Sequence, residues 1–337
     1  MGKKRAHGEG TVYQRSDGRW CAQLAVVLPD GRLVRRTVYG KTQREAREKL
    51  DRLRSQLASG LALDGGRVRL ADYLAEWLAA QEGRLRPRTL HRYQELVAYQ
   101  VVPFLGSLRL DQLTPSGVER WQRTLVEQGL SAKTAEHARA VLRRALADAE
   151  RDGLVARNAA RLARPLAVPR PIVSCWTREE AQRFLTATLE HWLWPLFALA
   201  LATGMRQGEL LGLSWEDVGD NTLLVRRQLQ RIDGRYHLVP LKTERSLREL
   251  PLSPLAREAL AVQCAQQAEW RATPLWDPTK PGAQWQLVFT SHAGSPLIGR
   301  DVARSFQTLA AAAGVPVVRF HDLRHTAATL LLEQGVD

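Results

Sequence analysis

The chain has 337 residues, of which 45% are hydrophobic, which suits two or three domains with buried cores and argues against wholesale disorder. Its formal net charge of +14 favours a polyanionic partner, most often nucleic acid. An acidic membrane surface is disfavoured because the sequence has neither an amphipathic basic helix nor a lipid signal. Three scattered cysteines without a Cys/His cluster argue against zinc, and the lack of a signal-peptide or transmembrane pattern predicts a soluble, cytosolic protein.

The N-terminal fifth of the chain predicts a small basic module. Residues 1–66 hold 14 Lys and Arg against 7 Asp and Glu. The difference, 14 − 7 = +7, is half of the net charge of the chain. Three runs of β-forming residues separated by turn sequences predict strands at 11–13, 20–27 and 33–39. Thr42-x-x-Glu45 then predicts the capping box of a helix. A basic three-stranded sheet is suited to insertion into a DNA groove, with Arg35 and Arg36 as candidate contacts. The alternative is an oligomerisation or spacer module.

A weakly patterned stretch at 60–66 predicts a linker, and residues 67–165 predict a helical domain. Its first helix carries an apolar stripe at i, i+3, i+4, i+7 and i+8. The stripe consists of Leu70, Tyr73, Leu74, Trp77 and Leu78. Three more helices are predicted from Pro87 through Tyr99, from Thr114-Pro115 to Gly129, and around 138–146.

Basic residues on the outer face of this domain are candidate phosphate contacts, although a solvated charged face is the alternative. They are Arg84, Arg86, Arg88, Arg92 and Lys133. Pro165, Pro169 and Pro171 then predict an extended linker. Arg164 and Arg170 make this linker a basic strap, which suits a protein that wraps a duplex.

Residues 172–337 predict a mixed α+β domain. Thr177-x-x-Glu180 predicts the cap of its first helix, and the apolar segment 192–202 predicts a buried helix. Strands are predicted at 222–228, 235–241, 247–252 and 287–290, and further helices at 255–270, 302–312 and 321–334. The chain is therefore expected to be multidomain and mainly α, with small β-sheets.

Arg206 and Glu209 form the first candidate group for chemistry. The buried helix ends at Gly204, Arg206 opens the next helix, and Glu209 lies one turn later on the same face. Surface Arg–Glu pairs are common, so this pair alone decides little.

The second candidate is Lys242, which lies between two predicted strands in the segment 240–243. A lysine on a β-hairpin is able to bring its ammonium group to a leaving oxygen.

The third candidate group is His321, Arg324 and His325, which share one face of a predicted helix at i, i+3 and i+4. Zinc binding by the two histidines is disfavoured, because Arg324 would oppose a cation and no carboxylate stands at the spacing of a third ligand. A phosphate is the better ligand, since arginine presents a planar fork of N–H donors to its oxygens.

In order and spacing, these three pieces resemble the motifs of tyrosine recombinases of the phage-integrase type. The matching pattern is Thr-Gly-Met-Arg-x-x-Glu-Leu-Leu-x-Leu at 203–213, then Lys-Thr at Lys242, then His-x-x-Arg-His-Thr from His321. The resemblance covers the whole chain. It implies an arm-type, AP2-like DNA-binding domain at 1–66, a SAM-like core-binding domain at 67–165 and a catalytic domain at 172–337.

The resemblance also implies a role for each matching residue. Two arginines clamp the scissile phosphate, an acidic residue orients the first arginine, a lysine protonates the leaving 5′-oxygen, and two histidines assist proton transfer or support the site. In this chain the matching residues are Arg206 and Arg324, Glu209, Lys242, and His321 and His325, respectively. A nucleophilic tyrosine keeps the bond energy in a 3′-phosphotyrosine, so the reaction is expected to need no ATP, metal or other cofactor.

The sequence departs from the family pattern after the His-x-x-Arg helix. In the family a Gly-His segment and the nucleophilic tyrosine follow, but all six tyrosines of this chain precede His321. The chain is therefore expected to lack its C-terminal end, and the nucleophile is left unassigned. We predict an integrase of a mobile element that binds double-stranded DNA and, when complete, forms a tetramer on it. The alternative is a truncated site-specific DNA-binding protein without catalytic activity.

Two further classes are less well supported. A type IB topoisomerase would use the same phosphate chemistry, but the arm-like N-terminal module favours sequence-specific recombination. An RNA-binding protein is disfavoured because no aromatic RNP-like motif is present.

Overall fold

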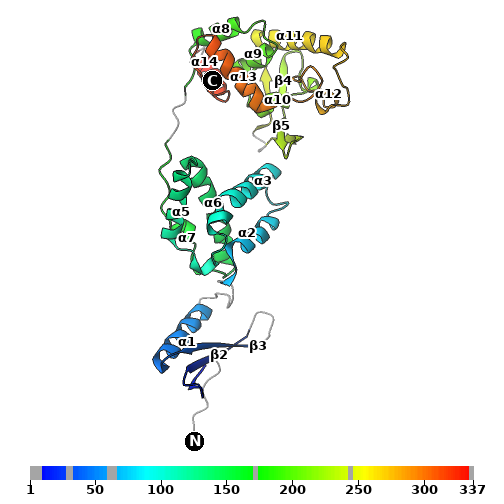
Figure 1. The fold of residues 1–337 in the computed structure, drawn as a ribbon. Helices are drawn as coiled ribbons and strands as arrows, with labels where there is room; N and C mark the ends of the chain where they lie inside the picture. Colours follow the sequence, from blue (N-terminus) through cyan, green and yellow to red (C-terminus); the bar gives the residue numbers. More distant parts are fainter. Residues whose placement is uncertain (1–9, 28–32, 59–66, 170–173, 242–245, 334–337) are drawn as a thin grey trace. The chain divides into compact units, whose positions relative to one another are not determined.

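The computed structural model describes residues 10–27, 33–58, 67–169, 174–241 and 246–333. The chain divides into two compact units, residues 1–169 and 170–337 (Figure 1). Helices predominate in the described residues, and their strands form one three-stranded and two two-stranded sheets. The predicted fold class, mainly α with small β-sheets, is confirmed. No helix in the described ranges has both the length and the apolar composition that crossing a membrane requires.

The N-terminal sheet is antiparallel in the order β1-β2-β3, and its strands are Thr11–Gln14, Trp20–Val27 and Leu33–Gly40. Helix α1, Gln43–Ala58, packs against it and encloses a small core that includes Ala22, Leu24, Ala46 and Leu50. The hydroxyl oxygen of Thr42 accepts a hydrogen bond from the backbone N–H of Glu45 at 3.2 Å, as the capping pattern predicts. The three predicted strands and the helix are confirmed.

The rest of the first unit is helical. Its elements are α2 (Leu70–Ala79), α3 (Pro87–Leu96), η2 (Val97–Val101), α4 (Val102–Leu105), η3 (Leu110–Gln112), α5 (Pro115–Glu127), α6 (Ala132–Arg151) and α7 (Ala159–Leu162). Four of the five residues of the apolar stripe of α2 are buried together with Trp121, Leu125 and Leu142 from α5 and α6, and the fifth, Leu78, is partly buried. The predicted cap of α5 is confirmed, because the Thr114 hydroxyl accepts the N–H of Gly117 at 3.1 Å.

The second predicted helix of this region ends earlier than expected. The α-helix stops at Leu96 rather than running through Tyr99, and Val97–Val101 form a wider π-helical turn. Within it the N–H of Val102 bonds to the carbonyl of Val97. The physical reason is Pro103, which has no N–H for the carbonyl of Tyr99 and whose ring crowds that carbonyl.

The second unit combines helices with two small sheets. Its elements are α8 (Arg178–Ala187), α9 (Trp194–Thr203), α10 (Gln207–Leu211), η4 (Trp215–Asp217), β4 (Thr222–Val225), β5 (Arg227–Ile232), β6 (Arg235–Pro240), β7 (Arg248–Pro251), α11 (Pro254–Arg271), α12 (Pro281–Gln284), α13 (Gly299–Ala312) and α14 (Asp322–Glu333). Strand β4 pairs with β7 and β5 pairs with β6, both antiparallel.

An aromatic cluster forms the centre of this unit. The rings of Trp176, Phe184, Phe197 and Phe306 pack with centroid separations between 4.9 and 5.7 Å. Trp176 also connects the start of the unit to α14, because its backbone N–H bonds to the hydroxyl of Thr326 at 3.1 Å. Helix α9 is buried on all sides, as its uninterrupted apolar sequence predicts.

Two predicted strands of this unit are wrong in detail. The single strand predicted at 222–228 is interrupted at Arg226, because β4 pairs with β7 whereas β5 pairs with β6. The side chains of Arg226 and Arg227 bond to the buried Asp217 at this change of partner. The segment predicted as a strand at 287–290 makes only isolated bridges. Its carbonyls at Leu287 and Val288 are bonded by the side chain of Gln267 instead of a partner strand.

Candidate active site

The junction between α9 and α10 places Arg206. Helix α9 ends at Gly204, whose φ of +61° is a left-handed conformation that a residue without a side chain adopts at little cost. The chain then turns, and Arg206 precedes the first residue of α10. Its backbone N–H bonds to Oε2 of Glu209 at 2.9 Å and its guanidinium to Oε1 at 2.8 Å. The two predicted residues therefore form one hydrogen-bonded pair.

Glu209 is bonded by a second arginine as well. Its side chain is 1% exposed, and Nη2 of Arg248 donates to its Oε2 at 2.8 Å. Burial alone would raise the pKa of Glu209, but hydrogen bonds from Arg248 and Arg206 outweigh it, and the pKa is lowered. Glu209 is thus held as a buried anion that fixes two guanidinium groups.

Arg324 from α14 joins the same group. Its Nη1 donates to the carbonyl oxygen of Gly204 at 2.6 Å. Burial lowers the pKa of Arg324, and the positive charges of Arg206 and Arg248 lower it further. Two guanidinium groups therefore bond to one carboxylate, and a third is held at the adjoining turn by the carbonyl of Gly204, which leaves a net positive site suited to an anion.

Arg248 was missed by sequence reasoning. It begins β7 and reaches Glu209 across 39 positions of sequence. The only sequence signal was a basic residue at the start of a predicted strand shortly after Lys242, which is too common to single out.

The two candidate histidines lie beside each other at the start of α14. The rings of His321 and His325 have centroids 5.7 Å apart and are perpendicular. Burial lowers the pKa of His321, and His325 and nearby arginines add to this effect more than Asp322 opposes it. A lowered pKa favours the neutral imidazole at pH 7, which is able to accept a proton. Among the residues that the structure describes, these histidines belong to no group of three potential metal ligands.

Lys242 and Arg170 lie outside the described residues. The strands that flank Lys242 correct the expectation that this lysine lies on a β-hairpin. Strands β6 and β7, on either side of Lys242, belong to different sheets, so the expected pairing of these two strands as a hairpin is wrong. The hairpin of this region is β5–β6, which precedes Lys242.

Close packing of α10 on β5 fixes where this hairpin lies. A Cβ atom added to Gly212 would come within 2.6 Å of the backbone nitrogen of Leu229 and 2.8 Å of the carbonyl carbon of Gln228. At Gly208 the nearest atom, the carbonyl oxygen of Leu229, would be 3.3 Å away. Helix α10, which follows Arg206, and the β5–β6 hairpin therefore approach each other closely at Gly208 and Gly212.

Replacing Gly212 with alanine should destabilise the protein by about 1–3 kcal/mol, because backbone atoms of β5 would have to move. Gly208→Ala is the matched control and should cost less, since its neighbours need to shift by only a few tenths of an ångström. Urea unfolding of both variants measures the difference. Equal stability of the two variants would contradict the packing argument.

The sheet register separates the two arginines proposed as DNA contacts in the N-terminal module. Arg36 pairs with Leu24, whose side chain is buried beneath α1, so Arg36 points to the helix side. Arg35 pairs with Ala25 on the opposite, open face and is exposed. The open face also carries side chains that sequence reasoning missed, namely Tyr13, Gln23, Thr37 and Tyr39.

Three proposed contacts lie in the helical part. Arg86 and Arg88 are exposed at the start of α3, and Lys133 is exposed at the start of α6. The helical period of α6 places His137 and Arg144 on the same stripe as Lys133. Arg144 was missed by sequence reasoning; it bonds to the hydroxyl of Tyr93 at 3.2 Å and lies over that ring. The sequence signal for Arg144 was its spacing of i, i+4 and i+11 with Lys133 and His137.

Comparison with known families matches both halves of this architecture. Residues 176–337 match the profile described as Phage integrase family, and residues 69–126 match the N-terminal SAM-like domain of phage integrase. A XerC-like tyrosine recombinase of Caldanaerobacter subterraneus is 28% identical over 331 residues, covering 91% of this chain and 83% of that protein. An integrase of Streptomyces ambofaciens is 28% identical over 356 residues, covering 100% of this chain and 88% of that protein.

Solved structures show a similar fold. The Tn1549 transposon integrase, in complex with transposon right end DNA, aligns with a TM-score of 0.70 and 21% identity, covering 80% of this chain and 88% of that one. A lambda integrase tetramer bound to a Holliday junction aligns with a TM-score of 0.59 and 22% identity, covering 97% of this chain and 92% of that one.

Proposed function

Because the chain belongs to the phage integrase family of tyrosine recombinases, we propose that it is a site-specific DNA recombinase that integrates a mobile element. The observation that carries the proposal is the pairing of Arg206 and Arg248 with the buried Glu209, beside Arg324 held on the carbonyl of Gly204. Fixed guanidinium groups stabilise the negative charge that builds on the non-bridging oxygens of a phosphodiester under attack.

The proposed roles follow from the chemistry of each group. Arg206 and Arg324 bind the scissile phosphate, and Glu209 orients Arg206 through two hydrogen bonds. His321, with its lowered pKa, exchanges a proton with the reacting oxygen. Lys242 is proposed as the acid that protonates the leaving 5′-oxygen. His325, perpendicular to His321, supports its position.

The nucleophile is not assigned within these 337 residues. All six tyrosines precede His321 in sequence, and only Tyr236 belongs to the second unit. Tyr236 packs against the apolar core from β6, with Arg231 over its ring at 5.7 Å. This environment gives Tyr236 a packing role rather than that of an attacking group.

We propose that three regions of the chain bind different parts of the DNA site. Residues 1–66 bind an arm-type site through the open face of β1–β3, residues 67–165 bind the core site, and residues 172–337 hold the scissile phosphate. We propose that the protein acts in the cytoplasm. We also propose that it assembles as a tetramer, as the lambda integrase does on a Holliday junction.

A suicide substrate tests this function. A duplex that carries the recombination site is nicked beside the cleavage position, so that a covalent protein–DNA adduct is trapped. The polypeptide is extended through any residues that its gene encodes after Asp337, and the products are separated on a denaturing gel. We expect an adduct that protease converts to a short peptide on the 3′-phosphate. Specific binding without any adduct would favour the alternative, a DNA-binding protein without catalytic activity.

A further inference from the structure

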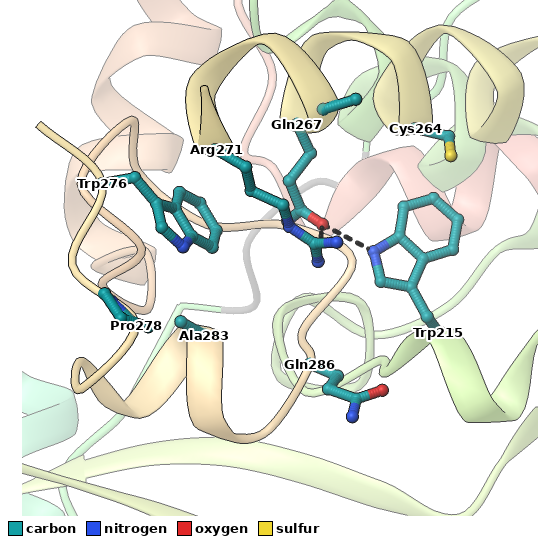
Figure 2. Close-up of a pocket in the computed structure, with 9 residues that line it drawn as sticks. Trp215, Cys264, Gln267, Arg271, Trp276, Pro278, Ala283 and Gln286 are labelled. Carbon is teal, nitrogen blue, oxygen red and sulfur yellow. Dashed lines mark hydrogen bonds between the residues drawn. The ribbon is translucent and has the colours of Figure 1, made fainter. Parts of the chain in front are cut away.

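A cavity beside the C-terminal half of α11 shares no residue with the arginine site. It has a volume of about 490 Å³ and lies between α11, η4 and the segment that contains α12 (Figure 2). The indole rings of Trp215 and Trp276 stand on opposite sides, and the side chain of Arg271 lies between them (Figure 2). Cys264 and Gln286 complete its polar lining.

A buried glutamine fixes two of these side chains. Gln267 is 2% exposed, and its Oε1 accepts hydrogen bonds from Nε1 of Trp215 at 2.7 Å and from Nη2 of Arg271 at 2.9 Å. Its Nε2 donates to the carbonyl of Leu287 at 3.0 Å and to the hydroxyl of Thr290 at 3.2 Å. A buried amide with every polar atom bonded orients the groups that it bonds, so the cavity wall is preorganised.

The lining defines the chemistry of a ligand. Arg271 is the only charged residue that lines the cavity, and it makes no ion pair within the described parts of the chain. Its guanidinium lies 5.5 Å from the centroid of the Trp276 ring and donates one of its five N–H groups to Gln267. One unpaired cation between aromatic walls fits a ligand that combines a flat ring with a negative charge.

We propose that this cavity binds a nucleotide, with the base against an indole ring and the phosphate on Arg271. Stacking on aromatic side chains beside a cation is the usual way in which proteins hold unpaired nucleotides. The choice of a nucleotide among aromatic anions rests on the proposed function, because a DNA recombinase meets nucleotides. The source is either a free nucleotide or an unpaired nucleotide of a DNA strand.

The alkylation rate of the exposed Cys264 reports whether a ligand occupies the cavity. It lines the cavity, whereas Cys175 is exposed elsewhere in the chain and serves as an internal control. Alkylation of both thiols is followed by mass spectrometry while the chain is titrated with dGMP or with a short single-stranded oligonucleotide. Protection of Cys264 but not of Cys175 is the expected result. Protection by dGMP indicates a free nucleotide, and protection by the oligonucleotide alone indicates a DNA strand.

Variants show whether the protection comes from this cavity. Arg271→Gln and Trp276→Leu should each raise the ligand concentration for half-protection by about 5- to 100-fold. Arg257→Gln removes the same charge from an exposed residue near the other end of the same helix and should leave this concentration unchanged. Circular dichroism checks that each variant is folded.

Two results would overturn the proposal: no protection of Cys264 by either ligand, or equal protection in wild type and Arg271→Gln. Duplex binding is measured on the same samples. If duplex binding persists without protection of Cys264, only the cavity proposal fails. If the wild-type chain does not bind duplex DNA at all, the proposed recombinase function fails instead.

Discussion

Strand cleavage should fall by about 100- to 1000-fold when either Arg206 or Arg324 is replaced with alanine. Arg206 is held by Glu209 and Arg324 by the carbonyl of Gly204, so both donors are positioned before the substrate arrives. Their contribution grows as negative charge develops on the phosphate oxygens in the transition state. The measurement is the single-turnover rate of adduct formation on the suicide substrate, with the polypeptide extended through any residues encoded after Asp337.

Duplex affinity of the same two variants should change by less than about threefold, because each arginine faces one phosphate among many. Arg183→Ala is a suitable control, since Arg183 is exposed and its guanidinium bonds to the backbone carbonyl of Gly314. It should alter neither cleavage nor binding. A parallel loss of binding and cleavage in Arg206→Ala would show that this residue contributes affinity rather than transition-state stabilisation.

Affinity for duplex DNA should fall by about 1,000- to 100,000-fold between about 50 and 200 mM salt if some six to ten phosphates are neutralised. The net charge of +14 supports this number of contacts. Arg35→Ala should reduce the slope of log affinity against log salt by about one, because Arg35 stands on the open face of the sheet. Arg36→Ala should change the slope much less, because Arg36 points toward α1. Fluorescence anisotropy with a labelled duplex measures both slopes.

An affinity that does not change with salt concentration would contradict phosphate binding as the main source of affinity. Equal slopes for the two variants would contradict the register argument. Since Arg35 and Arg36 are adjacent in sequence and identical in charge, only the pleat of the strand distinguishes them.

Local patterns in the sequence predicted most of the elements and part of the site. The pairing of Arg206 with Glu209 is a contact three residues apart, so helical geometry alone brings the two groups together. The capping box at Thr177 and Glu180 formed for the same reason, because both partners lie within one turn. The family resemblance added Arg324, which no local rule connects to Arg206.

Contacts between distant segments were not predictable from the sequence. Arg248 meets Glu209 only because β7 pairs with β4 and not with the preceding strand β6. The strand predicted at 222–228 is divided between two sheets, and the two arginines at the division bond to Asp217, a buried carboxylate that periodicity does not reveal. The α-helix predicted to run through Tyr99 ends at Leu96, because the chain forms a π-helical turn before Pro103.

The hydrogen bond between Trp176 and α14 connects the beginning of the second unit to the helix that carries Arg324. Thr326, which accepts the Trp176 N–H, lies two residues after Arg324 on the same helix. The indole of Trp176 also holds the carbonyl of Pro316, ahead of that helix. A displacement of the chain at residues 174–175 therefore acts on the helix that carries Arg324 as well as on the aromatic cluster that Trp176 joins. The position at which the chain enters the second unit and the position of this arginine are thus coupled by the fold itself.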